Sequence, residues 1–199
     1  MSDAPAIAVW EFDSIAIGIN AADAIAKGSP VASLLTGTTH PGKYVVLVGG
    51  DTASVDVARD IVRDQKADVA DHRFLPDPDR QVTSAVLSDA TVPATSAEAV
   101  GVVETSSVSS GIDASDAGVK AADVRLAALR LADGIGGKAY LVVEGTVGEV
   151  EAAVAAAQER AAGSYVASVV IPQITSELRD DLAASARFLD RVRTHGDGS

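Results

Sequence analysis

Two matching stretches, GINAADAIAK at residues 18–27 and GIDASDAGVK at residues 111–120, decide how this chain folds. They follow AIAVWE at residues 6–11 and AVGVVE at residues 99–104, at the same offset. The two pairs together hold about ten identities over roughly 28 positions, which indicates an internal duplication. The chain is therefore predicted to consist of two copies of one folding unit.

The match continues toward the end of each copy. A Gly-Lys pair precedes the apolar runs YVVLVGG at residues 44–50 and AYLVVEG at residues 139–145, and the copies close with Leu-Pro and Ile-Pro. Each copy has the pattern of an apolar strand, an Ala-rich helix, a glycine-rich loop, a buried β-branched strand, a second helix and a final strand. Such strand–helix–strand–strand–helix–strand units, with helices packed on a mostly antiparallel sheet, belong to the α+β class.

The domain boundaries follow from this pattern. We expect a first domain at residues 5–77, a linker at 78–97, a second domain at 98–174, and a C-terminal helix and tail at 175–199. The linker is rich in Ser, Thr, Pro and Asp, with one short strand expected at 82–87. Apolar spacing predicts a helix at 175–193. Thr146 and Glu149 form a capping-box pattern that predicts the start of a helix.

Composition excludes several classes of function. The 199 residues carry a net charge of −12, which opposes binding to nucleic acid. The absence of cysteine excludes disulfides, thiol nucleophiles and Cys-ligated metal centres. The N-terminus lacks a signal-peptide pattern, and no 18-residue run is free of charged or turn residues, so we expect a cytoplasmic protein without a membrane partner.

The ordered motifs of the second copy resemble the bacterial microcompartment shell domain. They are AVGVVET (99–105), GIDASDAGVKAADV (111–124), GIGGKAYLVVEGTVGEVEAA (134–153) and SVVIP (168–172). The first copy matches more loosely through AIAVWEF (6–12), GINAADAIAK (18–27), GKYVVLVGGDTASVDVA (42–58) and FLP (74–76). The resemblance implies two tandem shell domains, each a ferredoxin-like variant in the ordinary, non-permuted order of elements.

A chain with two such domains resembles the tandem-domain shell class, in which three subunits build a pseudohexagonal tile. The resemblance implies a homotrimer in a microcompartment shell within the cytoplasm, with hexameric tiles and pentameric vertices as partners and small polar metabolites passing through an axial pore. The implied pore positions are Thr39, His40, Pro41, Ile135, Gly136 and Gly137. The lysine at the tile edge in this family corresponds to Lys27 and Lys120.

The chain also departs from the family pattern. Members often carry an arginine directly after the terminal proline, where this chain has Asp77 and Gln173, so its edge contacts are expected to differ in detail. In some tandem shell proteins a pore-loop cysteine holds an iron–sulfur cluster, which a chain without cysteine cannot do. We therefore expect no cofactor and no metal.

No pattern in the chain indicates catalysis. Residues 37–44 match a phosphate-binding loop except at Tyr44, and they lead into a strand instead of a helix, which favours a turn or pore loop. The three histidines, His40, His72 and His195, lie far apart, and the chain shows no nucleophile–base spacing. The remaining alternative to a shell tile is a regulatory protein that senses small molecules through duplicated ferredoxin-like domains.

Overall fold

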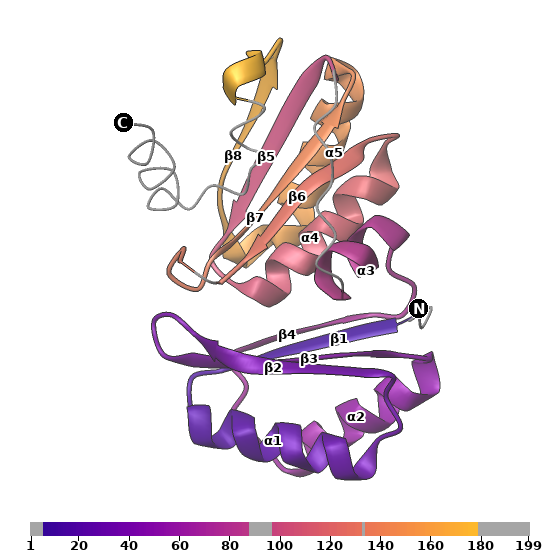
Figure 1. The fold of residues 1–199 in the computed structure, drawn as a ribbon, viewed down its shortest axis with the longest axis vertical. Helices are drawn as coiled ribbons and strands as arrows, with labels where there is room; N and C mark the ends of the chain where they lie inside the picture. The colour runs from indigo at the N-terminus through magenta and orange to yellow at the C-terminus, as the bar shows by residue number, and fades with distance from the viewer. Residues whose placement is uncertain (1–5, 88–96, 133, 179–199) are drawn as a thin grey trace, which may run out of the picture.

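The computed structural model describes residues 6–87, 97–132 and 134–178, and it contains the predicted duplication as two α+β units (Figure 1). The first unit comprises β1 (Ala6–Phe12), α1 (Ile15–Gly28), β2 (Ser33–Thr39), β3 (Lys43–Gly50), α2 (Thr52–Asp64) and β4 (Asp71–Leu75). The second comprises β5 (Ala99–Thr105), α4 (Val108–Ala121), β6 (Arg125–Leu131), β7 (Ala139–Gly145), α5 (Val147–Ala161), a 3₁₀ turn (Ala162–Ser164) and β8 (Tyr165–Pro172). The α+β class and the order of elements are confirmed.

The two sheets have the same topology. Their strand orders are β2-β3-β1-β4 and β6-β7-β5-β8, and every pair is antiparallel. The registers also correspond, because Glu11 lies opposite Asp71 in the first sheet and Glu104 lies opposite Ala167 in the second. The paired residues of β1 and β4 can therefore be matched with those of β5 and β8, although the second sheet has register shifts between Glu104 and Thr105 and between Leu126 and Ala128.

The first sheet is covered on both faces. Trp10 and Phe12 of β1 point to a core cluster that contains residues of α1 and α2. Ile7 and Val9 point the other way, into a cluster that includes Ile112 of α4. Because both faces are covered, all seven residues of β1 are buried, which explains its nearly continuous apolar sequence.

The second sheet has a more open outer face. Its inner face packs against α4 and α5, whereas Val100 and Val142 on the outer face contact Ile174, which follows β8. In contrast to the first sheet, no helix among the described residues covers the part of this face around Val102 (Figure 1). One sheet of the chain is thus enclosed and its duplicate is partly uncovered.

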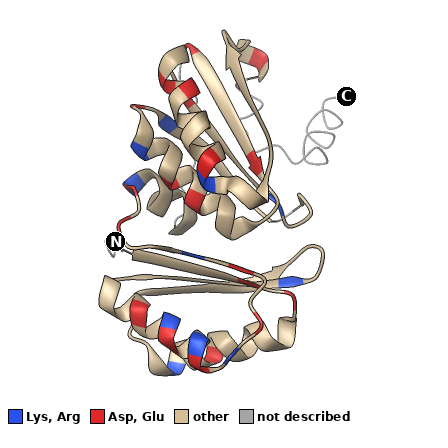
Figure 2. Cartoon of the chain, turned by 180° about the vertical axis from the view of Figure 1, so that it is seen from behind, with Lys and Arg blue, Asp and Glu red and all other residues tan. Residues whose placement is uncertain are grey.

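Local chemistry explains where the helices begin. The side chains of Ser14 and Ser107 accept hydrogen bonds at the N-termini of α1 and α4. The capping box expected at Thr146 and Glu149 is present at the start of α5. Along α2, basic and acidic side chains form exposed ion pairs, which marks its outer surface as a solvent-facing one (Figure 2).

The strand expected at residues 82–87 is wrong, because this segment forms the helix α3 (Arg80–Leu87). Its β-branched residues favour a strand by propensity, but Val82 is fully buried in the core between the units. The side chain of Gln81 fixes the helix against the second unit: it accepts from the amide of Leu126 at 2.7 Å and donates to the carbonyl of Val124 at 3.2 Å. Tertiary contacts therefore override the local preference for a strand.

Two other expectations extend beyond the described part of the chain. The segment at 78–97 contains α3, but its residues 88–96 lie outside the described residues. Residues 176–178 are helical, and the rest of the helix expected at 175–193, with the tail to residue 199, also lies outside them.

Candidate functional site

The two loops expected to line a pore contact each other on one side of the molecule, where the two units meet (Figure 1). The turn between β2 and β3 carries His40, and the turn between β6 and β7 carries Gly137. A Cβ atom built on Gly137 would lie only 2.2 Å from the carbonyl oxygen of His40. Glycine thus permits a close backbone approach between two loops that are far apart in sequence.

Each turn has its own backbone hydrogen bonds. In the first, the amide of Gly42 donates to the carbonyl of Thr39 at 2.8 Å. In the second, the amide of Ala132 donates to the carbonyl of Lys138 at 2.9 Å, and Gly136 has a φ of 69°. A positive φ of this size favours glycine, so the backbone itself explains part of the glycine-rich sequence.

The six expected pore positions differ in exposure. His40, Pro41 and Gly136 are exposed, whereas Thr39 and Ile135 are half-buried and Gly137 is buried against the other loop. The structure therefore brings all six positions together on one side of the junction between the two units. Gly136 is the open position of the second loop, and Gly137 contributes to the contact between the loops.

A lysine–glutamate pair lies at the base of each loop. Lys43 Nζ is 3.3 Å from Glu11 Oε2, and Lys138 Nζ is 2.5 Å from Glu104 Oε1. The repeated glutamates thus each pair with the lysine that follows a loop. Glu11 is buried, whereas Glu104 remains partly exposed.

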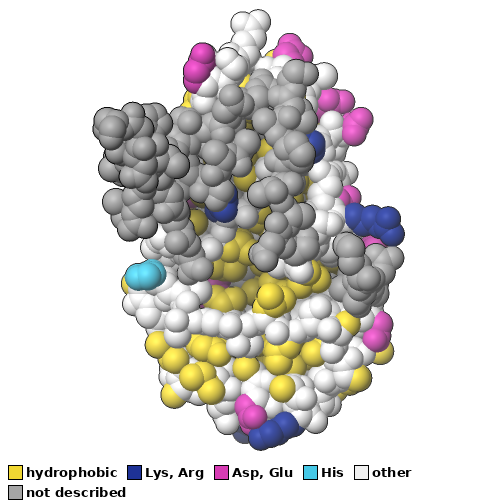
Figure 3. Space-filling view, in the orientation of Figure 1, with side chains coloured by type: hydrophobic (Ala, Val, Ile, Leu, Met, Phe, Trp, Pro, Cys, Tyr) yellow, Lys and Arg dark blue, Asp and Glu magenta, His cyan; other side chains and the backbone are white. Residues whose placement is uncertain are grey.

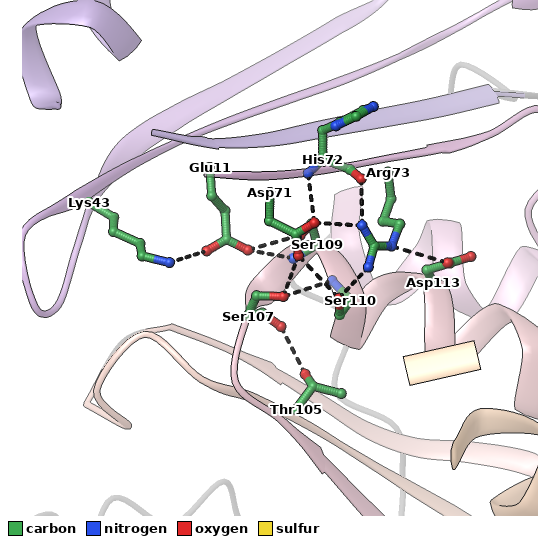
Figure 4. A network of polar contacts seen from close by, with 10 residues as sticks. All are labelled: Glu11, Lys43, Asp71, His72, Arg73, Thr105, Ser107, Ser109, Ser110 and Asp113. Atoms are coloured by element: carbon green, nitrogen blue, oxygen red, sulfur yellow. Dashed lines mark hydrogen bonds and ion pairs between the residues drawn. The ribbon is translucent and has the colours of Figure 1, made fainter. Parts of the chain in front are cut away.

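The two units are joined by a polar network that sequence analysis did not find (Figure 4). Glu11 Oε1 accepts from the amide of Ser109 at 2.8 Å and from its hydroxyl at 3.0 Å. Asp71 Oδ2 accepts from the hydroxyls of Ser107 at 2.6 Å and Ser109 at 2.7 Å. Two carboxylates of the first sheet therefore meet the N-terminus of α4, where the unpaired amides favour negative charge.

Arg73 extends this network along α4. Its guanidinium contacts Asp71 at 2.5 Å, donates to the hydroxyl of Ser110 at 2.8 Å, and lies 3.4 Å from Asp113 Oδ2. Arg73 thus gives hydrogen-bond or ion-pair partners to Asp71 of its own unit and to Ser110 and Asp113 of the other unit, as partly buried polar groups require.

The network shifts the pKa values of its two aspartates in opposite directions. Burial acts to raise the pKa of Asp71, but hydrogen bonds from Ser107 and Ser109 and the charge of Arg73 outweigh it and lower the pKa below 3.8. Ionised Asp71 therefore stabilises the contact at neutral pH, and this contribution is lost as the pH falls through the lowered value. Burial raises the pKa of Asp113, and the charges of Arg160 and Arg73 offset this only in part.

The two expected edge lysines lie in different surroundings. Lys27, in the last turn of α1, is 74% exposed and pairs with Asp23 at 2.6 Å. Lys120, in the last turn of α4, is 44% exposed, pairs with Asp116 at 2.7 Å and donates to the carbonyl of Asp77. Lys27 therefore presents its charge outward, whereas Lys120 also holds the junction between the two units.

The described residues do not form a recognisable catalytic or nucleotide site. Lys43 begins the strand β3, and the hydroxyl of Tyr44 bonds to Thr36, so the loop at 37–44 opens no helix and the turn interpretation is confirmed. His72 is exposed on β4, and His195 lies outside the described residues. In the described ranges no group of three His, Asp or Glu side chains could hold a metal ion. None of the helices described is long and apolar enough to cross a membrane.

These features define a class of protein: one α+β domain present twice in tandem, with corresponding loops of the two copies in contact. A family model for the BMC domain matches the chain twice, at residues 6–78 and 99–174. The chain therefore belongs to the BMC-domain family, the shell proteins of bacterial microcompartments, and carries the domain in tandem.

Known proteins agree with this assignment. The chain is 39% identical over 171 residues to the bacterial microcompartment shell protein PduT of Citrobacter freundii. The alignment covers 84% of this chain and 92% of PduT. A crystal structure of a microcompartment protein from Desulfitobacterium hafniense superposes with a TM-score of 0.77 at 37% identity, covering 88% of this chain and 98% of that one. A fused permuted hexameric shell protein of the RMM microcompartment shares the fold, with a TM-score of 0.53 at 22% identity and coverage of 78% and 81%.

Proposed function

We propose that this chain is a structural tile of a microcompartment shell, in which three copies form a pseudohexameric ring around a central pore. The observation that carries the proposal is the arrangement of the two expected pore loops, which contact each other on one side of the junction between the units. Three such pairs around one axis would supply six loops to a lumen.

The contact between the two units also supports a ring. It is heterologous, because the sheet of the first domain meets the helix α4 of the second. A heterologous contact that is repeated by a rotation dividing a full turn closes into a ring, which leaves no unpaired end. A chain with two domains then needs three copies to complete six positions.

The lumen would select solutes by size and hydrogen bonding. The expected pore positions contain no Asp, Glu, Lys or Arg, and the neighbouring lysines are paired with Glu11 and Glu104. Small polar metabolites are the class of solute that such a loop-lined opening would pass. Other shell proteins, both hexameric and pentameric, are the expected neighbours of the tile.

A hollow between the two domains bears on the alternative, a sensor of small molecules. It is lined by residues of β2, β3, α3 and the second domain, and its lining contains only apolar residues, glycine and threonine. The lining offers no charged side chain that could form an ion pair with a charged effector. The hollow therefore gives little support to the interpretation of the chain as a sensor. Saturable binding of an amino acid or nucleotide by a protein that forms no sheets would favour the sensor.

The oligomeric state is the first test. The purified protein is expected to have a native mass of three times 20.1 kDa, because each domain must bury its open lateral surface against another domain. Native mass spectrometry or light scattering measures this directly. A monodisperse monomer at micromolar concentration would contradict the proposed ring.

The tile edge is the second test. Lys27→Asp is expected to leave the trimer folded, with a change in stability below about 1 kcal/mol, since its ion pair with Asp23 is exposed. Formation of two-dimensional sheets, followed by electron microscopy, should nevertheless be lost. Lys66→Asp makes the same charge change at an exposed loop position and serves as the control. If both variants form sheets equally well, the assignment of Lys27 to the contact between tiles is wrong.

A further inference from the structure

The hollow between the two domains is a space that the packing of the chain leaves unfilled. It lies where the edge strand β2 meets α3 and the end of β6, and its volume is about 220 Å³. Leu47, Val108 and Ala132 form buried parts of its lining, whereas Leu35 is 46% exposed, so the hollow opens to solvent beside β2. Figure 3 shows hydrophobic side chains gathered along this border between the units. Because an apolar cavity of about 150 Å³ holds benzene, this hollow has room for a small molecule.

Gly37 keeps this space open. It lines the hollow, and no atom lies within 4 Å of a Cβ built there. The backbone of Gly37 does not lie in the left-handed region, so its conformation does not require glycine. In the second sheet the matching position, opposite Tyr140, holds Arg130. The duplicated fold therefore accepts a long side chain at this position of an edge strand, and a glycine inside a strand marks a place where a ligand can approach closely.

Thr39 supplies a polar group to the hollow. Its side chain lies on the same face of β2 as Gly37, because side chains alternate along a strand. Its Oγ1 is buried and has no hydrogen-bond partner in the part of the chain that the structure describes. A buried hydroxyl without a partner costs free energy, and it can both donate and accept a hydrogen bond. A ligand with one polar group would therefore provide the partner that the chain does not.

The lining also decides the charge of the ligand. It contains no Asp, Glu, Lys, Arg or His side chain. A charged group that entered the hollow would lose its hydration and gain no ion pair in return. Amino acids and nucleotides, the ligands considered for a sensor, are therefore excluded, and an uncharged molecule with a short apolar body fits best.

From these features we infer that the hollow binds a small uncharged molecule, whose apolar body packs on Leu47 and Val108 and whose hydroxyl or carbonyl group hydrogen-bonds to Thr39 Oγ1. Thr39 ends β2 and Ala132 directly follows β6, so the ligand contacts the base of each expected pore loop. All of the lining comes from one chain. The inference therefore goes beyond the proposed tile and does not depend on the ring.

The first test uses 1-pentanol as the probe, in a titration of the full-length protein followed by saturation-transfer NMR. Saturable binding with a millimolar Kd is expected, the affinity of a ligand with so few atoms. Pentanoate and pentylammonium have the same chain length with a charge at one end, and both should bind at least 10-fold more weakly. The inference is overturned if 1-pentanol shows no saturation up to about 20 mM, or if either charged probe binds as well.

A variant that fills the hollow places the binding there. Gly37→Ile is expected to weaken the binding of 1-pentanol at least 10-fold, because its side chain extends into the space that the ligand needs. Circular dichroism and native mass should stay unchanged, since β-branched residues favour strands. Gly163→Ile is the matched control, because it also has open space around it but lies in the turn after α5. Unchanged binding by folded Gly37→Ile would show that the ligand does not occupy the hollow.

A second variant tests the polar contact and keeps the inference testable if Gly37→Ile does not fold. Thr39→Val replaces the hydroxyl with a methyl group of similar size. It is expected to weaken the binding of 1-pentanol about fivefold, which corresponds to about 1 kcal/mol, with a thermal midpoint equal to that of the wild type or higher. Thr52→Val, at an exposed position of α2, is the control and should bind as the wild type does. Equal affinities of Thr39→Val and the wild type would overturn the assignment of Thr39 as the partner of the ligand.

Discussion

Gly111→Val is expected to destabilise the second domain and to weaken its contact with the first. A Cβ atom at Gly111 would lie 2.3 Å from the Cβ of Ala139 and 3.1 Å from Thr105 Oγ1. Both neighbours are fully buried on central strands, so neither can move aside as the end of a flexible side chain could. The expected loss of stability is at least about 3 kcal/mol, the upper part of the range for overpacked cores.

The effect of Gly111→Val should reach both domains, because α4 carries the serines that bind Glu11 and Asp71. Urea unfolding followed by circular dichroism measures the loss as a lower midpoint. Gly148→Ala is the matched control: it lies in α5 with open space around it and should be neutral or stabilising by about 0.5–1 kcal/mol. Equal midpoints for Gly111→Val and the wild type would contradict the close packing of α4 on β7.

The duplication explains why so much of the fold could be predicted from the sequence. The two copies give independent versions of one pattern, so a strand or helix expected in one is supported by the other. The matched glycines show the reason: Gly18 and Gly111 both bring a helix against the third strand of their sheet, where a Cβ would meet Tyr44 or Ala139. Local signals such as the capping box at Thr146 also needed no tertiary information.

The elements that were missed depend on contacts distant in sequence. The helix α3 has only eight residues, too few for a clear helical period, and the partners of Gln81 lie on β6 and just before it. The polar network joins Glu11 to Ser109 across nearly half of the chain. No local pattern reveals such a contact.

One signal for the network was nevertheless present in the alignment of the two copies. Identical residues define the shared fold, whereas the differences mark where the copies have different neighbours. Ser109 in place of Ala16 and Asp113 in place of Asn20 are such differences, and the structure places both serine and aspartate against Asp71 and Arg73. A comparison of the copies for charge, in addition to identity, would have indicated an interface on α4.

The expected pore loops lead to the prediction with the largest effect on function. Gly136→Trp is expected to reduce metabolite flux at least severalfold in shells where this protein supplies the only open pore. Gly136 is exposed, and no atom lies within 4 Å of a Cβ built there, so the indole has room to extend from the loop without a clash inside the chain. Three copies around the axis would place three indoles in the lumen, where pore diameter decides passage.

The substitution has a local cost, because a φ of 69° disfavours side chains by roughly 1–2 kcal/mol, and the trimer must therefore be verified before flux is measured. Gly163→Trp is the matched control, since Gly163 is also exposed with open space around it but lies in the turn after α5. Flux should fall for Gly136→Trp alone. Equal flux through the two variants, in shells that contain equal amounts of intact trimer, would show that the loop between β6 and β7 does not line the path of the metabolite.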